Sequence, residues 1–175
     1  MPEDTVAALT ALLLALIAIA AVFDASKGRI PDWVTLPAIG AGLALSGAEG
    51  GFAAGRPCLQ DALLGAALGA GILALPWAVG GMGAGDVKLM AAVGALSGLA
   101  FTVRAALLSA LVGAAMALCV AIWTGRFGET MSRTIRAAAL RSPHESDRPP
   151  LTIPFGLAIS LGAAWAILLD LKVIP

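Results

Sequence analysis

The hydrophobic positions of the chain fall into six apolar runs, which polar or glycine-rich segments separate. A helical run of about 18 residues reaches roughly 27 Å, close to the thickness of a bilayer core. The pattern therefore predicts an all-α fold, a polytopic membrane protein built as a compact bundle of about six transmembrane helices. The runs cover residues 6–23, 33–48, 62–79, 90–102, 105–123 and 151–171.

The first run is interpreted as a membrane span and not as a cleaved signal peptide. Signal peptides begin with a basic segment, whereas this run follows Glu3 and Asp4. Further along the chain, Arg104 interrupts the apolar residues between 90 and 123. It is interpreted as the boundary between the fourth and fifth spans.

Composition supports a membrane protein and argues against nucleic acid as a partner. The chain has 175 residues, of which 59% are hydrophobic and 13% charged, with a mean hydropathy of +0.94. Soluble domains carry about a quarter charged residues. The net charge is zero and no basic tract is present, so nucleic acid is not an expected partner. We treat residues 1–175 as a single transmembrane domain.

The lysines and arginines are distributed unevenly between the two sides of the membrane that the runs would span. With the N-terminus outside, eight lysines and arginines fall on the cytoplasmic side and three on the other, which is the bias of inner-membrane proteins. This topology places Asp24 and Asp86 on the cytoplasmic face at matching depths. The polar segment 125–150 becomes a cytoplasmic loop, for which an interfacial helix and a disordered loop both fit.

The segment 81–89 is an unusual interruption, because it places Asp86 and Lys88 between two apolar runs. A carboxylate is costly in lipid and asks for a reason. Three glycines lead into it, which indicates a tight turn or a close backbone approach. The simpler explanation is a helix N-terminal acid favoured by the helix dipole and paired with Lys88 or Arg29. For Asp24, the simpler explanation is a solvated acid at the end of a span.

Taken together, Asp24 and Asp86 fit a two-carboxylate site. Two adjacent carboxylates do not both ionise readily and share a proton. One can then draw a proton from water while the other donates to a carbonyl oxygen. Neither a metal nor a cofactor is predicted, because Cys58, Cys119 and the single His144 form no ligand motif.

The remaining acids have structural interpretations. Asp32 follows Ile30-Pro31 and fits a cap of the second span, while Asp61 and Asp170 fall on the opposite side of the membrane. The spans also carry small residues at the four-residue spacing that lets membrane helices approach closely, which favours a compact bundle. The two instances are Gly65 with Gly69 and Gly94 with Gly98.

Three segments carry a resemblance to a known family, the prepilin peptidases, which are membrane aspartic proteases. Residues 83–89, with the sequence GAGDVKL, match the second signature of the family throughout. Asp24, the basic residues after it and Ile30-Pro31 match the first signature, but Asp32 stands where asparagine is usual. Residues 153–158 resemble the final-span motif of the family.

The resemblance implies Asp24 and Asp86 as the catalytic pair, with no cofactor. It implies a role in loop geometry or substrate binding for Gly83, Gly85, Lys88, Ile30 and Pro31. The implied partners are membrane lipid and a prepilin or pseudopilin with a basic leader, cut at the cytoplasmic surface. Larger members carry a further segment with paired cysteines, so the resemblance is to the small subtype of Flp/Tad-type pili, often called TadV or CpaA.

Two alternatives stay open at this point. The first is another protease with a Gly-x-Gly-Asp signature, such as a preflagellin peptidase. The second is not an enzyme: a small transporter, or a subunit of a secretion complex that uses Asp86 in an ion path.

Overall fold

The computed structural model describes residues 3–50, 59–78, 80–125 and 155–173, and none of them lies in a strand. The prediction of an all-α fold is therefore confirmed for this part of the chain. The predicted loop 125–150 beyond Gly125, and with it His144, lies outside the described residues, as does Cys58. The helices are α1 (Glu3–Lys27), α2 (Asp32–Gly50), α3 (Leu59–Ala78), α4 (Ala84–Trp123) and α6 (Phe155–Val173).

Three of these helices are long and apolar enough to cross a membrane by length and composition. They are α1 over Ala7–Lys27, α3 and α4, and Phe155–Asp170 in α6 forms a shorter apolar helix. Large hydrophobic side chains such as Leu75, Leu107 and Ile122 are exposed on the outer faces. Such a surface is typical of helices that face lipid and not water. The chain is thus a multi-pass membrane protein.

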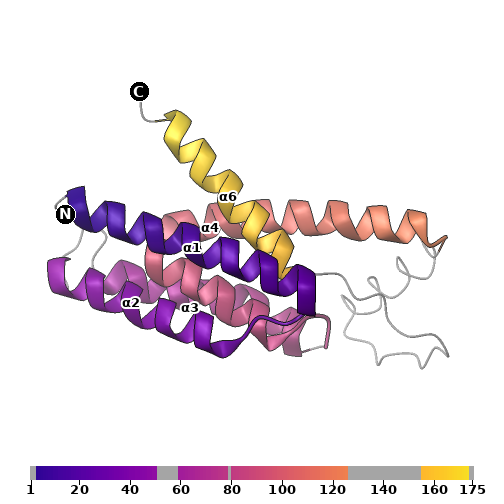
Figure 1. The fold of residues 1–175 in the computed structure, drawn as a ribbon, viewed down its shortest axis with the longest axis horizontal. Helices are drawn as coiled ribbons and strands as arrows, with labels where there is room; N and C mark the ends of the chain where they lie inside the picture. Colours follow the sequence, from indigo (N-terminus) through magenta and orange to yellow (C-terminus); the bar gives the residue numbers. More distant parts are fainter. Residues whose placement is uncertain (1–2, 51–58, 79, 126–154, 174–175) are drawn as a thin grey trace.

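The long helix α4 reverses direction at Gly98, where φ is 78° and ψ is 179°. A straight helix would place residues 86 and 113 about 40 Å apart, yet both line one cavity. The first half of α4 lies within the bundle, and the second half runs past the end of α1 (Figure 1). With α4 counted as two, the described residues form six helical segments, which agrees with the predicted bundle.

The predicted boundary at Arg104 is wrong, because the chain turns at Gly98 instead. Only glycine adopts the positive φ of this turn without strain. Arg104 lies inside the second half of α4, where its guanidinium forms an ion pair with Asp170 of α6. A partner for its charge explains why an arginine can stay within the helix.

The reversal at Gly98 is stabilised from α3. The Asp61 carboxylate, in the first turn of α3, accepts a hydrogen bond of 3.2 Å from the backbone N–H of Leu99. The first N–H groups of a helix have no partner within that helix, and an acid normally satisfies them from the preceding residue. Here the acid comes from a neighbouring helix, so one side chain fixes both the turn and the packing of α3.

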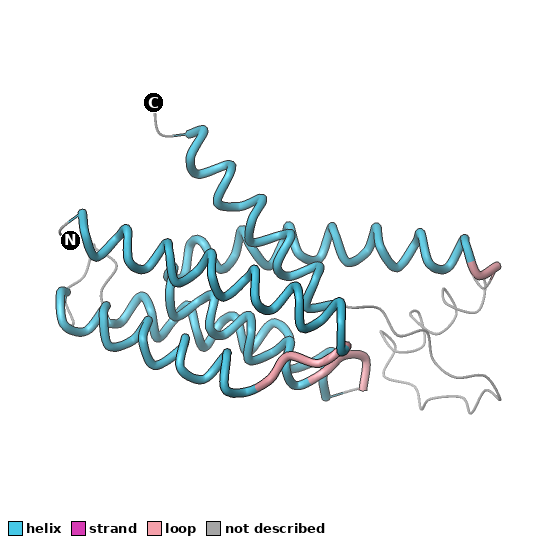
Figure 2. The backbone as a smooth tube through the Cα atoms, viewed as in Figure 1, coloured by secondary structure: helices cyan, strands magenta, loops and turns pink. Residues whose placement is uncertain are grey.

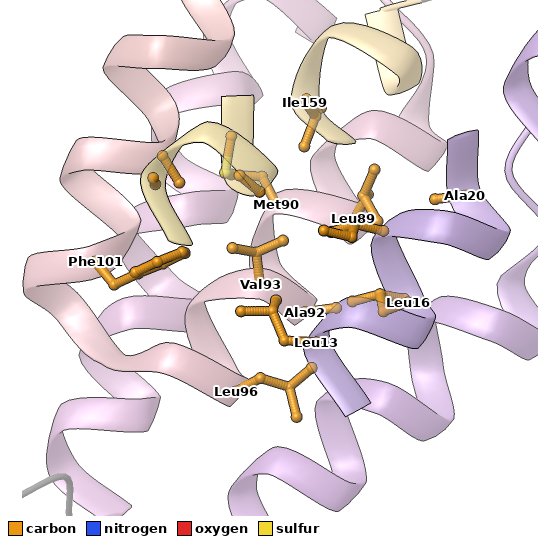
Figure 3. Packing of buried hydrophobic residues seen from close by; sticks show 14 of the residues in the cluster. Leu13, Leu16, Ala20, Leu89, Met90, Ala92, Val93, Leu96, Phe101 and Ile159 are labelled. Atoms are coloured by element: carbon orange, nitrogen blue, oxygen red, sulfur yellow. The ribbon is translucent and has the colours of Figure 1, made fainter. Parts of the chain in front are cut away.

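The first half of α4 is the centre of the bundle. Every residue from Leu89 to Leu96 is buried, and a helix that is apolar and buried all round is a core helix. Figure 3 shows Leu89 and Val93 among side chains from α1, such as Leu16, and from α6, where Ile159 lies. Asp86 precedes this buried stretch by less than one turn, so it lies at one end of the bundle axis.

The predicted close packing of small residues is confirmed between α3 and the first half of α4. A Cβ atom at Gly65 would meet the carbonyl group of Gly94, and one at Gly94 would meet that of Gly65. A Cβ atom at Gly69 would likewise meet the carbonyl oxygen of Met90. The two backbones therefore touch, as in other membrane helix pairs with this spacing.

One end of the bundle carries the features of a membrane–water interface. The loops that join α1 to α2 and α3 to α4 lie together at this end (Figure 2). Exposed tryptophans lie at helix ends here: Trp33 is the second residue of α2, Trp77 the second-last of α3 and Trp123 the last of α4. Tryptophan is enriched at membrane interfaces. This is the end at which the candidate site lies.

Candidate active site

Asp24 is a buried residue within α1. The helix continues through it to Lys27, so Asp24 lies in the last part of the helix and not after its end. Its side chain is only 6% exposed. The explanation of Asp24 as a solvated acid is therefore wrong. Its Oδ2 atom accepts a 2.7 Å hydrogen bond from the backbone N–H of Leu157.

The start of α6 packs closely against Asp24. Leu157 lies in the first turn of α6, where backbone N–H groups lack partners within the helix. A Cβ atom at Gly156 would lie 2.9 Å from Cγ of Asp24 and 2.6 Å from Cδ1 of Ile30. Only a residue without a side chain lets the backbone approach this far. The sequence prediction did not include Gly156, although the resemblance of residues 153–158 to a family motif was a signal for it.

Asp86 lies in the first turn of α4 and is 8% exposed. Its Oδ2 atom accepts a 3.3 Å hydrogen bond from the backbone N–H of Gly83, the residue that caps the helix. The expectation of a helix N-terminal acid is thus confirmed. Of the two expected partners, Lys88 was wrong, because its ammonium lies 2.7 Å from Oδ2 of Asp32 instead.

The loop between α1 and α2 contacts the start of α4 through Ile30 and Gly85. Ile30 is buried, and a Cβ atom at Gly85 would lie 3.2 Å from both its Cβ and its carbonyl oxygen. Gly83 has φ −79° and ψ 149°, an extended conformation that any residue adopts. Pro31 directly precedes α2, and its carbonyl accepts a hydrogen bond from the N–H of Val34. Glycine is favoured by the close approach at Gly85, and not by an unusual backbone at Gly83.

Asp24 and Asp86 line the same cavity, which has a volume of about 1230 Å³. The Asp24 carboxylate is close enough to act electrostatically on Asp86. Both connecting loops contribute to the wall, and Arg29 is the basic residue among the lining side chains. The rest of the wall is largely apolar and comes from α3, the second half of α4 and α6, including Ile72, Ala114 and Phe155.

The structure thus brings together the two acids that the sequence singled out, from positions 62 residues apart. Asp61 and Asp170 do not contribute to this cavity, and each is engaged elsewhere in the fold. In the part of the chain that the structure describes, no three histidine, cysteine or acidic side chains gather into a group that could hold a metal ion. Two buried carboxylates that face one cavity can share a proton and act as acid and base.

Comparison with known proteins identifies relatives of the chain. The type IV leader peptidase family matches the chain over residues 11–118, a range that includes both acids. The prepilin leader peptidase/N-methyltransferase of Aeromonas hydrophila is 37% identical over 169 residues, which cover 92% of this chain and 49% of that protein. The protein of the same name from Neisseria gonorrhoeae is 38% identical over 125 residues, with 67% and 41% covered.

The chain spans about half the length of the curated relatives that it matches. No solved structure matches it significantly. The matching family consists of membrane aspartic-type proteases, and the match extends over more than half of the chain. The chain therefore belongs to the type IV leader peptidase family.

Proposed function

We propose that this protein is a membrane aspartic endopeptidase that removes the basic leader peptide of prepilins or pseudopilins, with Asp24 and Asp86 as its catalytic pair. The observation that carries the proposal is the position of the two acids: both are buried, and both line one cavity. The names of the relatives support the substrate class, since they are prepilin leader peptidases.

The reaction follows from a shared proton between the two carboxylates. The ionised carboxylate takes a proton from a water molecule, which attacks the scissile carbonyl carbon. The protonated carboxyl donates a hydrogen bond to the carbonyl oxygen, and a proton is later delivered to the leaving amine. Because the two groups titrate as a unit, we assign no separate acid or base role to either residue.

The site faces the cytoplasm in this proposal. Lys27, Arg29 and Lys88 lie at the end of the bundle that carries the cavity, whereas Arg104 lies in the other half. An excess of lysine and arginine marks the cytoplasmic side of inner-membrane proteins. A substrate whose apolar helix lies in the membrane would present its leader at this surface.

Cleavage by the purified protein tests the proposal. The protein in lipid nanodiscs is incubated with a prepilin that has a short basic leader, and mass spectrometry locates the cut. We expect one cut, after the last glycine of the leader, and no cut with Asp24→Asn or Asp86→Asn. Asp170→Asn is the matched control, because it removes a carboxylate outside the cavity. Intact substrate after incubation with the folded wild-type protein would contradict the proposal.

We further propose that the substrates belong to Flp/Tad-type pili, on the sequence resemblance to the small subtype of the family. The test is competition between two substrates in the same assay. A Flp-type prepilin is expected to be cut with a higher kcat/KM than a type IVa prepilin. Equal or reversed preference would contradict this assignment and leave the peptidase proposal intact.

A further inference from the structure

Asp32 and Lys88 form an ion pair outside the cavity. The Lys88 Nζ atom lies 2.7 Å from Oδ2 of Asp32, and the two side chains are 38% and 57% exposed. Neither residue lines the cavity that holds Asp24 and Asp86. Asp32 is the first residue of α2, and Lys88 lies in the first two turns of α4. The pair therefore ties together the starts of α2 and α4.

Lys88 is oriented away from Asp86. Residues two positions apart on a helix do not face the same side, and the partner of Lys88 is on α2. The loop after Asp24 reaches α4 at a second point, since Ile30 packs against Gly85. The α1–α2 connection thus touches α4 once before Asp86, through an apolar contact, and once after it, through an ion pair.

We propose that Asp32 and Lys88 are positioning residues for the carboxylate pair. Their ion pair holds the start of α2 on the start of α4, which keeps Ile30 on Gly85 and fixes the spacing between Asp24 and Asp86. The effect on catalysis rests on the proposed function, but the effect on spacing does not. An asparagine at position 32 would retain an oxygen that can accept a hydrogen bond from the Lys88 ammonium.

The kinetic test uses the prepilin cleavage assay. Asp32→Ala and Lys88→Ala each lower kcat about tenfold while KM stays near the wild-type value, because a small misplacement of catalytic groups slows chemistry without removing substrate contacts. Asp32→Asn retains the hydrogen bond and loses less than about threefold. The exchanged variant, Asp32→Lys with Lys88→Asp, recovers most of kcat, as expected when two residues act through each other.

Global stability separates positioning from folding. An exposed ion pair contributes little to the free energy of unfolding, so the thermal midpoints of these variants stay close to wild type. Arg104→Ala is the matched control, because it breaks the exposed Arg104–Asp170 pair in the other half of the molecule. It leaves kcat unchanged.

A second readout needs no substrate. Asp24→Cys and Asp86→Cys are combined with Cys58→Ser and Cys119→Ser, and a short bifunctional thiol reagent reports their spacing in membranes. Addition of Asp32→Ala slows intramolecular cross-linking about fivefold, because the reagent demands a fixed separation. The exchanged pair restores the rate. If the wild-type protein cut no prepilin, the proposed function would fail while this measurement still tested the positioning.

Three results would overturn the inference. One is Asp32→Ala with wild-type kcat and wild-type cross-linking. Another is a rise in KM with unchanged kcat, which would make Asp32 a substrate-binding residue. The third is failure of the exchanged pair to recover in either assay although each single alanine variant is impaired.

Discussion

The Oδ2 atom of Asp24 lies 2.7 Å from the backbone nitrogen of Leu157, a residue 133 positions later in the chain. An acid near the end of the first helix thereby satisfies an N–H group at the start of the last one. The interaction resembles a helix N-cap supplied from another helix. The position of Asp24 thus depends on the close approach of α6.

Gly156→Ala is predicted to lower kcat by about tenfold or more, because misplaced catalytic groups lose rate steeply. Its Cβ atom would lie 2.9 Å from Cγ of Asp24, so either the carboxylate or the start of α6 must shift. The measurement is kcat with a prepilin substrate, beside the thermal midpoint. Gly71→Ala is the control, since a Cβ atom at Gly71 meets nothing within 4 Å. Equal rates for the two variants would remove the role of Gly156.

Gly85→Val is predicted to impair processing through the contact between Ile30 and the start of α4. A Cβ atom at Gly85 would lie 3.2 Å from the Ile30 Cβ and carbonyl oxygen, and valine adds two further methyl groups. Overpacking of this kind typically costs roughly 1–3 kcal/mol. Cleavage rates are compared with those of Gly40→Val in α2, because a Cβ atom at Gly40 would have no other atom within 4 Å. A wild-type rate for Gly85→Val would show that catalysis does not depend on the close contact between Ile30 and Gly85.

Gly65→Leu is predicted to destabilise the bundle without touching the cavity. Its side chain would enter the contact between the backbones of α3 and α4 at Gly94. We expect a loss of at least about 1–3 kcal/mol in the free energy of unfolding, the usual cost of overpacking. Denaturation in detergent micelles measures it, with Gly71→Leu on the same helix as control. Equal stability of the two variants would refute close α3–α4 packing.

Much of the fold could be predicted from hydrophobicity alone, because the first, second, third and sixth apolar runs each became a helix within a few residues of the expected bounds. The turn in α4 could not. Gly98 lies among apolar residues and resembles the other small residues of the spans, whereas Arg104 looks like a boundary. Recognising the true turn required two contacts that depend on the fold: Asp61 with Leu99, and Arg104 with Asp170.

In the candidate site, too, some residues could be predicted from the sequence and others could not. Asp24 and Asp86 stand out in the sequence because charge is rare in apolar surroundings, and counting basic residues placed them on one face. The groups that hold them do not stand out. The Leu157 N–H is a backbone group, Gly156 is one of 21 glycines, and the Asp32–Lys88 pair joins residues 56 positions apart.

Asp61→Ala is predicted to destabilise the turn at Gly98 while the site keeps its chemistry. Loss of a capping acid typically costs about 1 kcal/mol, and the N–H of Leu99 would lose its partner. The free energy of unfolding falls accordingly, and kcat of the folded protein stays at the wild-type value. Asp61→Asn retains an acceptor oxygen and serves as the conservative control. An unchanged stability in Asp61→Ala would argue against a capping role.

Single-turnover kinetics show whether Asp24 and Asp86 act as one unit. Rates of prepilin cleavage are measured for Asp24→Asn, Asp86→Asn and the double variant, with Asp170→Asn as control. Groups that work together lose nearly all their contribution when either is removed. We therefore predict that each single variant loses at least about a thousandfold and that the double variant is no slower. Substantial cleavage by either single variant, or losses that multiply in the double variant, would contradict a catalytic pair.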